Sequence, residues 1–280
     1  MDTSKFDEIG YWSEIKLDII REYAVAYSKI LSAQTKPSFY HIYIDTFSGA
    51  GVNISRNTGD FVLGSPLNAL SVEPPFREYH LIDIKKEKIE SLDHLIGDRE
   101  DVFLYQGDCN KIILEDIIPK VGYKDYRRAL CILDPYGLHL DWDVVYNMGK
   151  EKSIEIFLNF PVADMNRNVL WRDATNVSES QIERMNKFWG DTSWENVAYV
   201  DSKQKHLFGN EIKEKTSNET IANAYRHRLK EVAGFKYVPM PIAMKNSQNA
   251  IIYYFFFASP KPVAENIVKS IFNKYEDRMT

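Results

Sequence analysis

The sequence has few cysteines and no long apolar run. Cys109 and Cys131 are the only cysteines in 280 residues, too few for a disulfide framework and not in a metal-ligand spacing, so both are predicted to be reduced thiols in or near the core. The longest apolar candidate, 250–258, has the length of a strand and not of a membrane-spanning helix. The first residues lack the basic flank and apolar centre of a signal peptide, so a cytoplasmic location with no membrane partner is the default expectation.

An excess of positive charge is also missing. The formal net charge is -5, whereas a protein that grips nucleic acid through its phosphates is expected to carry a basic surface. This charge argues against a uniformly basic surface and leaves room for a local basic patch. The six histidines show no convincing ligand spacing, so no metal site is predicted.

Strands and helices alternate through the first part of the chain. Five short apolar stretches are predicted to be strands: 41–45, 79–84, 102–108, 128–137 and 153–161. A helix predicted at 9–31 precedes the first strand, and its Lys16 is expected to be a solvated charge. Because parallel neighbours need crossover connections, this alternation predicts an α/β fold with a doubly wound, mostly parallel sheet and helices on both faces.

The second part of the chain departs from this alternation. Residues 162–218 form a polar, tryptophan-containing stretch, which we interpret as a helical insertion or lid subdomain within a single domain that spans 1–280. Strands predicted at 235–244 and 250–258 are joined by a short polar turn, which is typical of an antiparallel hairpin. Two prolines in the first of these strands place it at the sheet edge, because proline cannot donate a hydrogen bond to a central strand pairing. A sheet of about seven strands is expected.

Four of the predicted strands end in an acidic residue: Asp45, Asp83, Asp108 and Asp134. The first of them leads into a turn that contains Gly49 and Gly51, where a ligand can approach the main chain closely. In a doubly wound sheet the carboxyl ends of the strands lie along one edge, and ligands bind there. Because several like charges brought together are costly unless something satisfies them, a ligand rich in hydrogen-bond donors is expected at this edge.

These strand ends resemble the successive motifs of a known enzyme class. The segments 45–51, 107–109 and 134–137, together with Asp83, resemble the motifs of Rossmann-like S-adenosylmethionine-dependent methyltransferases, whose sheet also ends with an antiparallel strand. More narrowly, 44–51 and 133–137 combined with 64–67 resemble the three-Cys-motif partner family over most of the chain. The three cysteines of that name belong to a protein encoded nearby. The resemblance therefore implies S-adenosyl-L-methionine as the cofactor and a three-Cys-motif protein as a partner.

The resemblance also implies roles for individual residues. The cofactor-binding residues would be Asp45, Gly49 and Gly51 around the methionine part, Phe47 in the same loop, Asp83 at the ribose hydroxyls, and Asp108 with Cys109 near the adenine. The catalytic residues would be Asp134, Pro135 and Tyr136, which are expected to line the methyl-acceptor pocket. Asn159, at the end of the next strand, is expected to be structural.

The acceptor stays open at this stage. Asp-Pro-Pro-Tyr sequences in nucleic-acid amino-methyltransferases bind an amine through the acid and a carbonyl while the aromatic ring stacks on the base, but here one proline is missing and Gly137 follows Tyr136. An amino group of a nucleobase is therefore one option, with nucleic acid as a candidate partner.

Two alternatives lie outside methyl transfer. The chain can be a cofactor-binding scaffold or sensor for the three-Cys-motif protein, without a reaction of its own. It can also be an NAD-dependent oxidoreductase, since a strand, a glycine loop and a later acid describe dinucleotide folds too. Against the second, the third glycine is missing and Asp83 comes much farther on than the expected spacing of about 20 residues.

Overall fold

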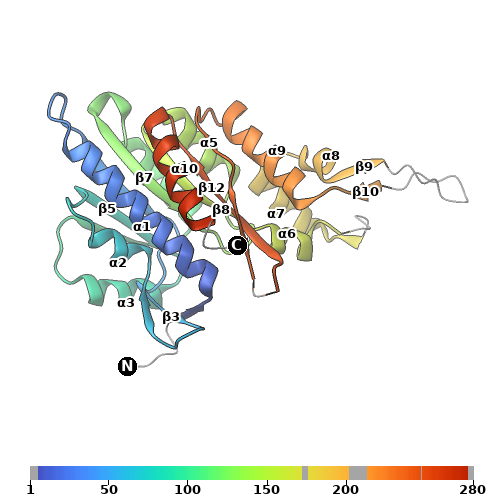
Figure 1. Cartoon of the computed structure of the whole chain (residues 1–280), viewed down its shortest axis with the longest axis horizontal. Helices are drawn as coiled ribbons and strands as arrows, with labels where there is room; N and C mark the ends of the chain where they lie inside the picture. The colour runs from blue at the N-terminus through green and yellow to red at the C-terminus, as the bar shows by residue number, and fades with distance from the viewer. Residues whose placement is uncertain (1–5, 172–175, 202–212, 247, 277–280) are drawn as a thin grey trace, which may run out of the picture.

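The computed structural model describes residues 6–171, 176–201, 213–246 and 248–276. A seven-stranded sheet runs through its centre in the order β11-β12-β8-β7-β2-β5-β6 (Figure 1). Its strands are β2 (Tyr40–Asp45), β5 (Glu78–Asp83), β6 (Val102–Gln106), β7 (Arg127–Leu133), β8 (Ile154–Phe160), β11 (Ile242–Lys245) and β12 (Ile251–Ala258). Neighbours from β6 to β8 pair in parallel, whereas β12 pairs antiparallel with both β8 and β11. The predicted α/β class with a mostly parallel sheet is confirmed.

The antiparallel hairpin lies at one edge of the sheet, as predicted. β11 is the outermost strand, and it begins at Ile242, directly after the second of two prolines. It is shorter than the predicted 235–244 because Pro239 and Pro241 cannot donate hydrogen bonds to a neighbouring strand. β12 is buried over most of its length and occupies an interior position between β8 and β11.

Helices cover both faces of the sheet. One face carries α1 (Tyr11–Ser32), α2 (Ser65–Leu70), α3 (Lys86–Ile96) and α10 (Pro262–Glu276). The other carries α4 (Cys109–Ile112), α5 (Trp142–Glu151), α7 (Glu179–Trp189) and α9 (Asn218–Glu231). α1 buries Ile15, Ile19 and Tyr23, whose spacing of four residues keeps them on the side that faces the sheet. It contacts α10, and Figure 1 shows these two helices crossing the same face.

A small second sheet follows the glycine loop. It consists of β1 (Asp7–Ile9), β3 (Val52–Ser55) and β4 (Phe61–Leu63), with β3 in the middle. Polar turn residues between β3 and β4 reverse the chain, and β1 pairs in parallel with β3. This pairing draws the segment that precedes α1 over the carboxyl ends of the main strands, where it helps to enclose a cavity.

The described part of 162–218 contains three helices and a short hairpin. These are α6 (Val162–Asn168), α7, α8 (Trp194–Ala198), β9 (Tyr199–Asp201) and β10 (Lys213–Lys215). Phe188 and Trp189 of α7 are buried against Tyr225 of α9, so this part shares the core of one sheet face. Figure 1 shows β9 and β10 at the end of the molecule opposite α3. Residues 172–175 and 202–212 of the predicted insertion lie outside the described residues, and its role as a lid stays a prediction.

Both cysteines are free and buried, as predicted. Among the helices that the structure describes, none has the length and apolar character needed to cross a membrane. The cytoplasmic location stays a prediction.

Candidate functional site

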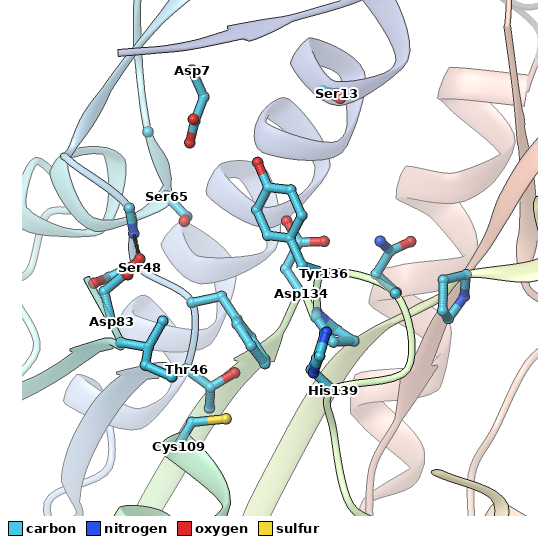
Figure 2. Close-up of a pocket in the computed structure, with 18 of the residues that line it drawn as sticks. Asp7, Ser13, Thr46, Ser48, Ser65, Asp83, Cys109, Asp134, Tyr136 and His139 are labelled. Carbon is cyan, nitrogen blue, oxygen red and sulfur yellow. Dashed lines mark hydrogen bonds between the residues drawn. The ribbon is translucent and has the colours of Figure 1, made fainter. Parts of the chain in front are cut away.

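A cavity of about 760 Å³ opens at the carboxyl ends of the parallel strands. This volume lies within the range of about 300–1,000 Å³ that is usual for small-molecule sites. Figure 2 shows its two sides: Ser48, Asp83, Thr46 and Cys109 lie on one, and Asp134, Tyr136 and His139 on the other. Open α/β sheets bind their ligands at this edge.

Most of the predicted site residues line this one cavity. They are Phe47, Gly49, Gly51, Asp83, Asp108, Cys109, Asp134, Pro135 and Tyr136. Asp45 does not, and its side chain is fully buried. The strand registers explain the difference, because Asp45 pairs with Leu81 and Ile132, each two residues before the aspartate that reaches the cavity. Two residues of a strand span about 7 Å, so Asp45 lies one pleat below the cavity floor.

Asp45 is held beneath the cavity by uncharged donors. Its carboxylate accepts hydrogen bonds from the Tyr43 hydroxyl at 3.3 Å and from the Phe47 amide at 3.4 Å. Burial raises its pKa to about 6, a shift that hydrogen bonding from Ser65 opposes and the charge of Asp134 reinforces. A direct contact between Asp45 and a ligand therefore stays a prediction that the burial of this side chain does not favour.

Asp83 and the glycine loop form one side of the cavity. The Asp83 oxygens accept hydrogen bonds from the Gly49 amide at 3.0 Å and from the Lys85 amide at 2.9 Å, which ties the loop after β2 to the end of β5. Gly49 has a φ of +66°, and a Cβ built there meets nothing within 4 Å, so its main chain faces open space. Gly51 has a φ of +85°, and a Cβ there would lie 2.7 Å from Leu92 of α3. The first glycine thus exposes backbone to the cavity, and the second allows α3 to pack closely.

An apolar surface and a capped helix follow on the same side. Ile84 lines the cavity although the residue is 69% exposed, and the strand-end pattern carries no signal that would select it. Asp108 caps α4 by accepting a hydrogen bond from the Asn110 amide at 3.0 Å. Burial raises the pKa of Cys109 to about 12, so its thiol is protonated at neutral pH and is a packing group, not a nucleophile.

Lys16 is buried and pairs with Asp134, whereas the sequence predicts a solvated charge at this position. Lys16 of α1 donates a hydrogen bond to Asp134 Oδ2, and the two side chains are 10% and 32% exposed. Burial by itself lowers the pKa of Lys16, but the charge of Asp134, the Tyr253 hydroxyl, the hydrogen bond to Asp134 and the charge of Asp45 together raise it above its ordinary value. The expectation of a solvated Lys16 is wrong, because Asp134 comes from β7 and only the packing of α1 on the sheet brings the two together.

A second ion pair closes the top of the cavity. Lys88 of α3 donates a hydrogen bond to Asp7 Oδ2 of β1 at 2.6 Å. The Lys88 ammonium also lies 5.8 Å from the ring centre of Tyr136, whose side chain is 70% exposed. Figure 2 shows Asp7 above Ser65 and Tyr136. Within the described residues, no group of three or more His, Cys, Asp and Glu side chains is arranged to hold a metal ion.

No protein-family model matches the chain, and no curated protein matches it either. Among solved structures, a protein from Legionella pneumophila is similar over 92% of this chain and 91% of its own, with a TM-score of 0.54 and 12% identity. A proposed S-adenosylmethionine-dependent methyltransferase from Listeria monocytogenes is similar over 85% of this chain and 98% of its own, with a TM-score of 0.41 and 12% identity. Trm1 from Pyrococcus horikoshii, in complex with S-adenosyl-L-methionine, is similar over 92% of this chain and 58% of its own, with a TM-score of 0.40 and 12% identity.

The similarity to the Legionella pneumophila protein concerns the fold alone, since the identity is 12%. The mostly parallel seven-stranded sheet with an antiparallel hairpin at one edge is the architecture that the sequence predicts. Its antiparallel strand β12, inserted between β8 and β11, distinguishes the sheet from an all-parallel dinucleotide-binding sheet. The narrower resemblance to the three-Cys-motif partner family stays a prediction.

Proposed function

We propose that the protein is an S-adenosylmethionine-dependent methyltransferase. The observation that carries the proposal is that one cavity joins two sets of residues with different chemistry. The glycine loop, Asp83 and Ile84 form one side, and the Lys16–Asp134 pair and Tyr136 form the other. A transferase needs both a donor site and an acceptor site within reach of each other, because alignment of the reacting groups supplies much of the acceleration of a displacement.

The first side fits the cofactor. Gly49 offers exposed backbone next to open space for the amino-acid part. Asp83 uses its oxygens for two backbone amides, and each carboxylate oxygen retains a lone pair that can accept a hydroxyl of the ribose. The exposed Ile84 side chain presents an apolar surface to a flat adenine ring, near Asp108 and Cys109. When bound, the cofactor supplies an electrophilic methyl group on a sulfonium.

The second side belongs to the acceptor in this proposal. Asp134 orients the acceptor and accepts its proton, a role in general base catalysis that requires hydrogen-bond reach of the reacting atom. Tyr136 offers an exposed ring for stacking, which agrees with an amino group of a nucleobase as the acceptor and with nucleic acid as a partner. A three-Cys-motif protein is the second proposed partner, and the region 162–218 is proposed to be an insertion that acts as a lid.

Calorimetry with S-adenosylmethionine, S-adenosylhomocysteine and NAD tests the proposal. We expect the first two compounds to bind and NAD not to bind. Binding of NAD alone would replace the proposal with an oxidoreductase. A turnover assay with labelled methyl donor on cellular RNA, DNA and protein fractions, with the three-Cys-motif protein present, then tests transfer. Cofactor binding with no transfer to any fraction would favour a scaffold or sensor.

A further inference from the structure

A second hollow, of about 250 Å³, lies at the amino ends of the parallel strands, away from the cavity at their carboxyl ends. α1 and α10, which Figure 1 shows crossing the same face of the sheet, form its walls together with the starts of β7 and β8. Much of its wall is apolar and comes from Ile30, Leu31, Phe39, Val263, Ala264 and Ile267. An apolar cavity of about 150 Å³ accommodates benzene. This amino-end hollow therefore has room for a small ring or branched chain that carries one polar group.

A buried cation without an acidic partner lines the amino-end hollow. Arg128, at the start of β7, is 9% exposed, and no carboxylate of the described residues forms an ion pair with it. Burial lowers the pKa of Arg128, and the neighbours that oppose this shift are Tyr123 and Tyr27, not acids. A buried charge is costly unless it is paired. An anionic ligand in the hollow would supply the counter-charge.

The Arg128 guanidinium is fixed with one edge free. Its Cζ lies 4.8 Å from the ring centre of Phe39 and 4.1 Å from that of Tyr123. Nη1 donates to the main-chain oxygens of Tyr123 at 3.1 Å and Arg127 at 2.7 Å. Nε and Nη2 have no hydrogen-bond partner within the described part of the chain, and neither is among its enclosed unpaired atoms, so both keep accessible surface. These two N–H groups lie side by side, an arrangement that binds a carboxylate through two parallel hydrogen bonds.

Arg99 uses the same edge of its guanidinium for this purpose. Its Nε and Nη2 donate to the two oxygens of Asp101 at 3.0 and 2.7 Å. That pair lies nearer the surface, with side chains 39% and 33% exposed. Arg128 presents the same two donors from a more enclosed position. The comparison indicates that a carboxylate is the partner that fits this edge of Arg128.

The other charged groups at the hollow favour an anion as well. Lys261, next to α10, donates to the Tyr123 hydroxyl at 3.2 Å and has no ion pair among the residues that the structure describes. Glu155 lines the hollow too, and burial raises its pKa to about 7. Hydrogen bonds from Tyr23 and Ser259 and the charge of Lys261 oppose this rise. Below pH 7 the two cations therefore share the hollow with a mostly neutral acid.

We propose that the amino-end hollow binds a small apolar carboxylate, whose two oxygens accept hydrogen bonds from Nε and Nη2 of Arg128 and whose apolar body packs against Ile30 and Ile267. Lys261 adds a second positive charge beside the carboxylate. A neutral amide of the same shape offers one acceptor oxygen where the carboxylate offers two. Inorganic phosphate offers oxygens without an apolar body. The site is separate from the proposed methyl-transfer cavity and does not depend on the proposed function.

Methyl NMR tests the inference on the full chain labelled at its isoleucine δ1 methyl groups. Benzoate, phenylacetate and isovalerate are each titrated at pH 6, in parallel with benzamide, phenylacetamide, isovaleramide and inorganic phosphate. Shifts at Ile30 and Ile267 report the amino-end hollow, and Ile84 reports the methyl-transfer cavity. We expect at least one carboxylate to bind in the hollow ten times or more tightly than its amide and than phosphate. Saturating S-adenosylhomocysteine should leave this affinity unchanged.

Variants assign the preference to the two cations. Arg128→Gln is expected to reduce the preference for the carboxylate over its amide to threefold or less. Because Arg128 also donates to the main chain, Lys261→Met is a second variant that leaves those contacts in place. It should weaken carboxylate binding at least threefold and leave amide binding unchanged. Lys269→Met removes an equal charge from an exposed side chain of α10 that does not line the hollow, and it should behave as the wild type.

The pH dependence tests whether the carboxylate lies close to Glu155. The titratable and charged groups around this acid are Tyr23, Tyr27, Arg128 and Lys261. Between pH 6 and 8 Glu155 ionises and repels the ligand, so carboxylate affinity should fall at least threefold. Glu155→Gln should abolish this fall.

Four results would overturn the inference. They are equal binding of a carboxylate and its amide, shifts at Ile84 without shifts at Ile30 and Ile267, a preference that survives both Arg128→Gln and Lys261→Met, and an affinity that is the same at pH 6 and 8. Failure of S-adenosylhomocysteine to bind would remove the proposed function instead. The carboxylate titrations would still decide whether the amino-end hollow is a binding site.

Discussion

Each end of the parallel strands places an acid beside a hollow that a cation also lines, but the acid has different partners at the two ends. At the carboxyl end, Asp134 makes a direct ion pair with Lys16 beside a cavity of about 760 Å³. At the amino end, the hydrogen-bond donors to Glu155 among the described residues are the hydroxyls of Tyr23 and Ser259, beside a hollow of about 250 Å³. Arg128 lines the same hollow and donates to backbone carbonyls instead.

Because of this difference, we expect Asp134 to take part in the reaction and Glu155 to contribute to packing. Burial raises the pKa of Glu155 to about 7, against the opposing effect of its two hydroxyl partners, so it is largely neutral in mildly acidic solution. Lys16 instead carries a pKa above its ordinary value although burial lowers it, chiefly because Asp134 faces it, so Lys16 keeps its positive charge. A charge at an open cavity can interact with a ligand, whereas a neutral buried acid only forms hydrogen bonds with the groups around it.

The largest expected effect tests whether Asp134 serves chemistry. Asp134→Ala is expected to lower methyl transfer by about 10²–10⁴-fold, the usual contribution of a positioned general base. Binding of S-adenosylhomocysteine should stay within about threefold of the wild type, because Asp134 lies on the acceptor side. Radiolabel transfer and calorimetry measure the two quantities. Glu155→Gln is the control from the amino end and should retain transfer. If Asp134→Ala instead lost binding of S-adenosylhomocysteine and kept methyl transfer, Asp134 would belong to the cofactor side and not to the acceptor side.

Asp83→Ala is the next largest and tests the cofactor side. The variant loses the proposed ribose contact. It also loses the hydrogen bonds that the Gly49 and Lys85 amides donate to Asp83. Hydrogen bonds to a charged group contribute about 1.5–3 kcal/mol, so we expect affinity for S-adenosylhomocysteine to fall by about 10–100-fold. Calorimetry at constant ionic strength measures the change. An affinity equal to that of the wild type would mean that Asp83 only orders the loop.

The sequence alone predicts where the parallel strands lie and at which edge of the sheet their acidic residues meet. Apolar stretches ending in aspartates located the parallel strands and their carboxyl edge, and two prolines located the edge strand. The pattern of single strands could not show the pleat on which each aspartate lies, because that depends on registers between strands, and so Asp45 was grouped with Asp83 and Asp134.

Pairs between distant segments were the other limit. Lys16 pairs with a residue 118 positions away and Lys88 with one 81 positions away. Neither lysine carries a local signal that separates it from a solvated charge on a helix. The β3–β4 hairpin is different, because the sequence carries a local signal for it. Apolar residues alternate with others on both sides of a polar turn, at Val52 and Ile54 before it and at Phe61 and Leu63 after it, which is typical of a hairpin.

Glu155→Gln is expected to stabilise the protein in alkaline solution. A pKa raised from 4.5 to about 7 means that the native state holds a proton that the unfolded state has released, so stability falls as pH rises through this interval. The shift corresponds to about 3 kcal/mol, and re-pairing of the amide offsets about 1 kcal/mol. We expect a gain of about 2 kcal/mol above pH 7, shrinking toward pH 4.5. Urea unfolding at several pH values measures it, and a gain independent of pH would contradict the burial of a charge.

Asp45→Asn should have the smallest effect and sharpens the comparison. Burial raises the pKa of Asp45 from 3.8 to about 6. The loss of folding stability that ionised Asp45 causes therefore also grows with pH, and it reaches its full size near pH 6. The gain should be about 1 kcal/mol, less than for Glu155, because Lys16 loses a neighbouring negative charge when Asp45 becomes neutral. Between pH 6 and 7 the gain from Asp45→Asn should be level while that from Glu155→Gln still rises. Parallel urea titrations of the two variants distinguish these curves. Coincident curves would mean that the two ends of the sheet hold their acids in the same way.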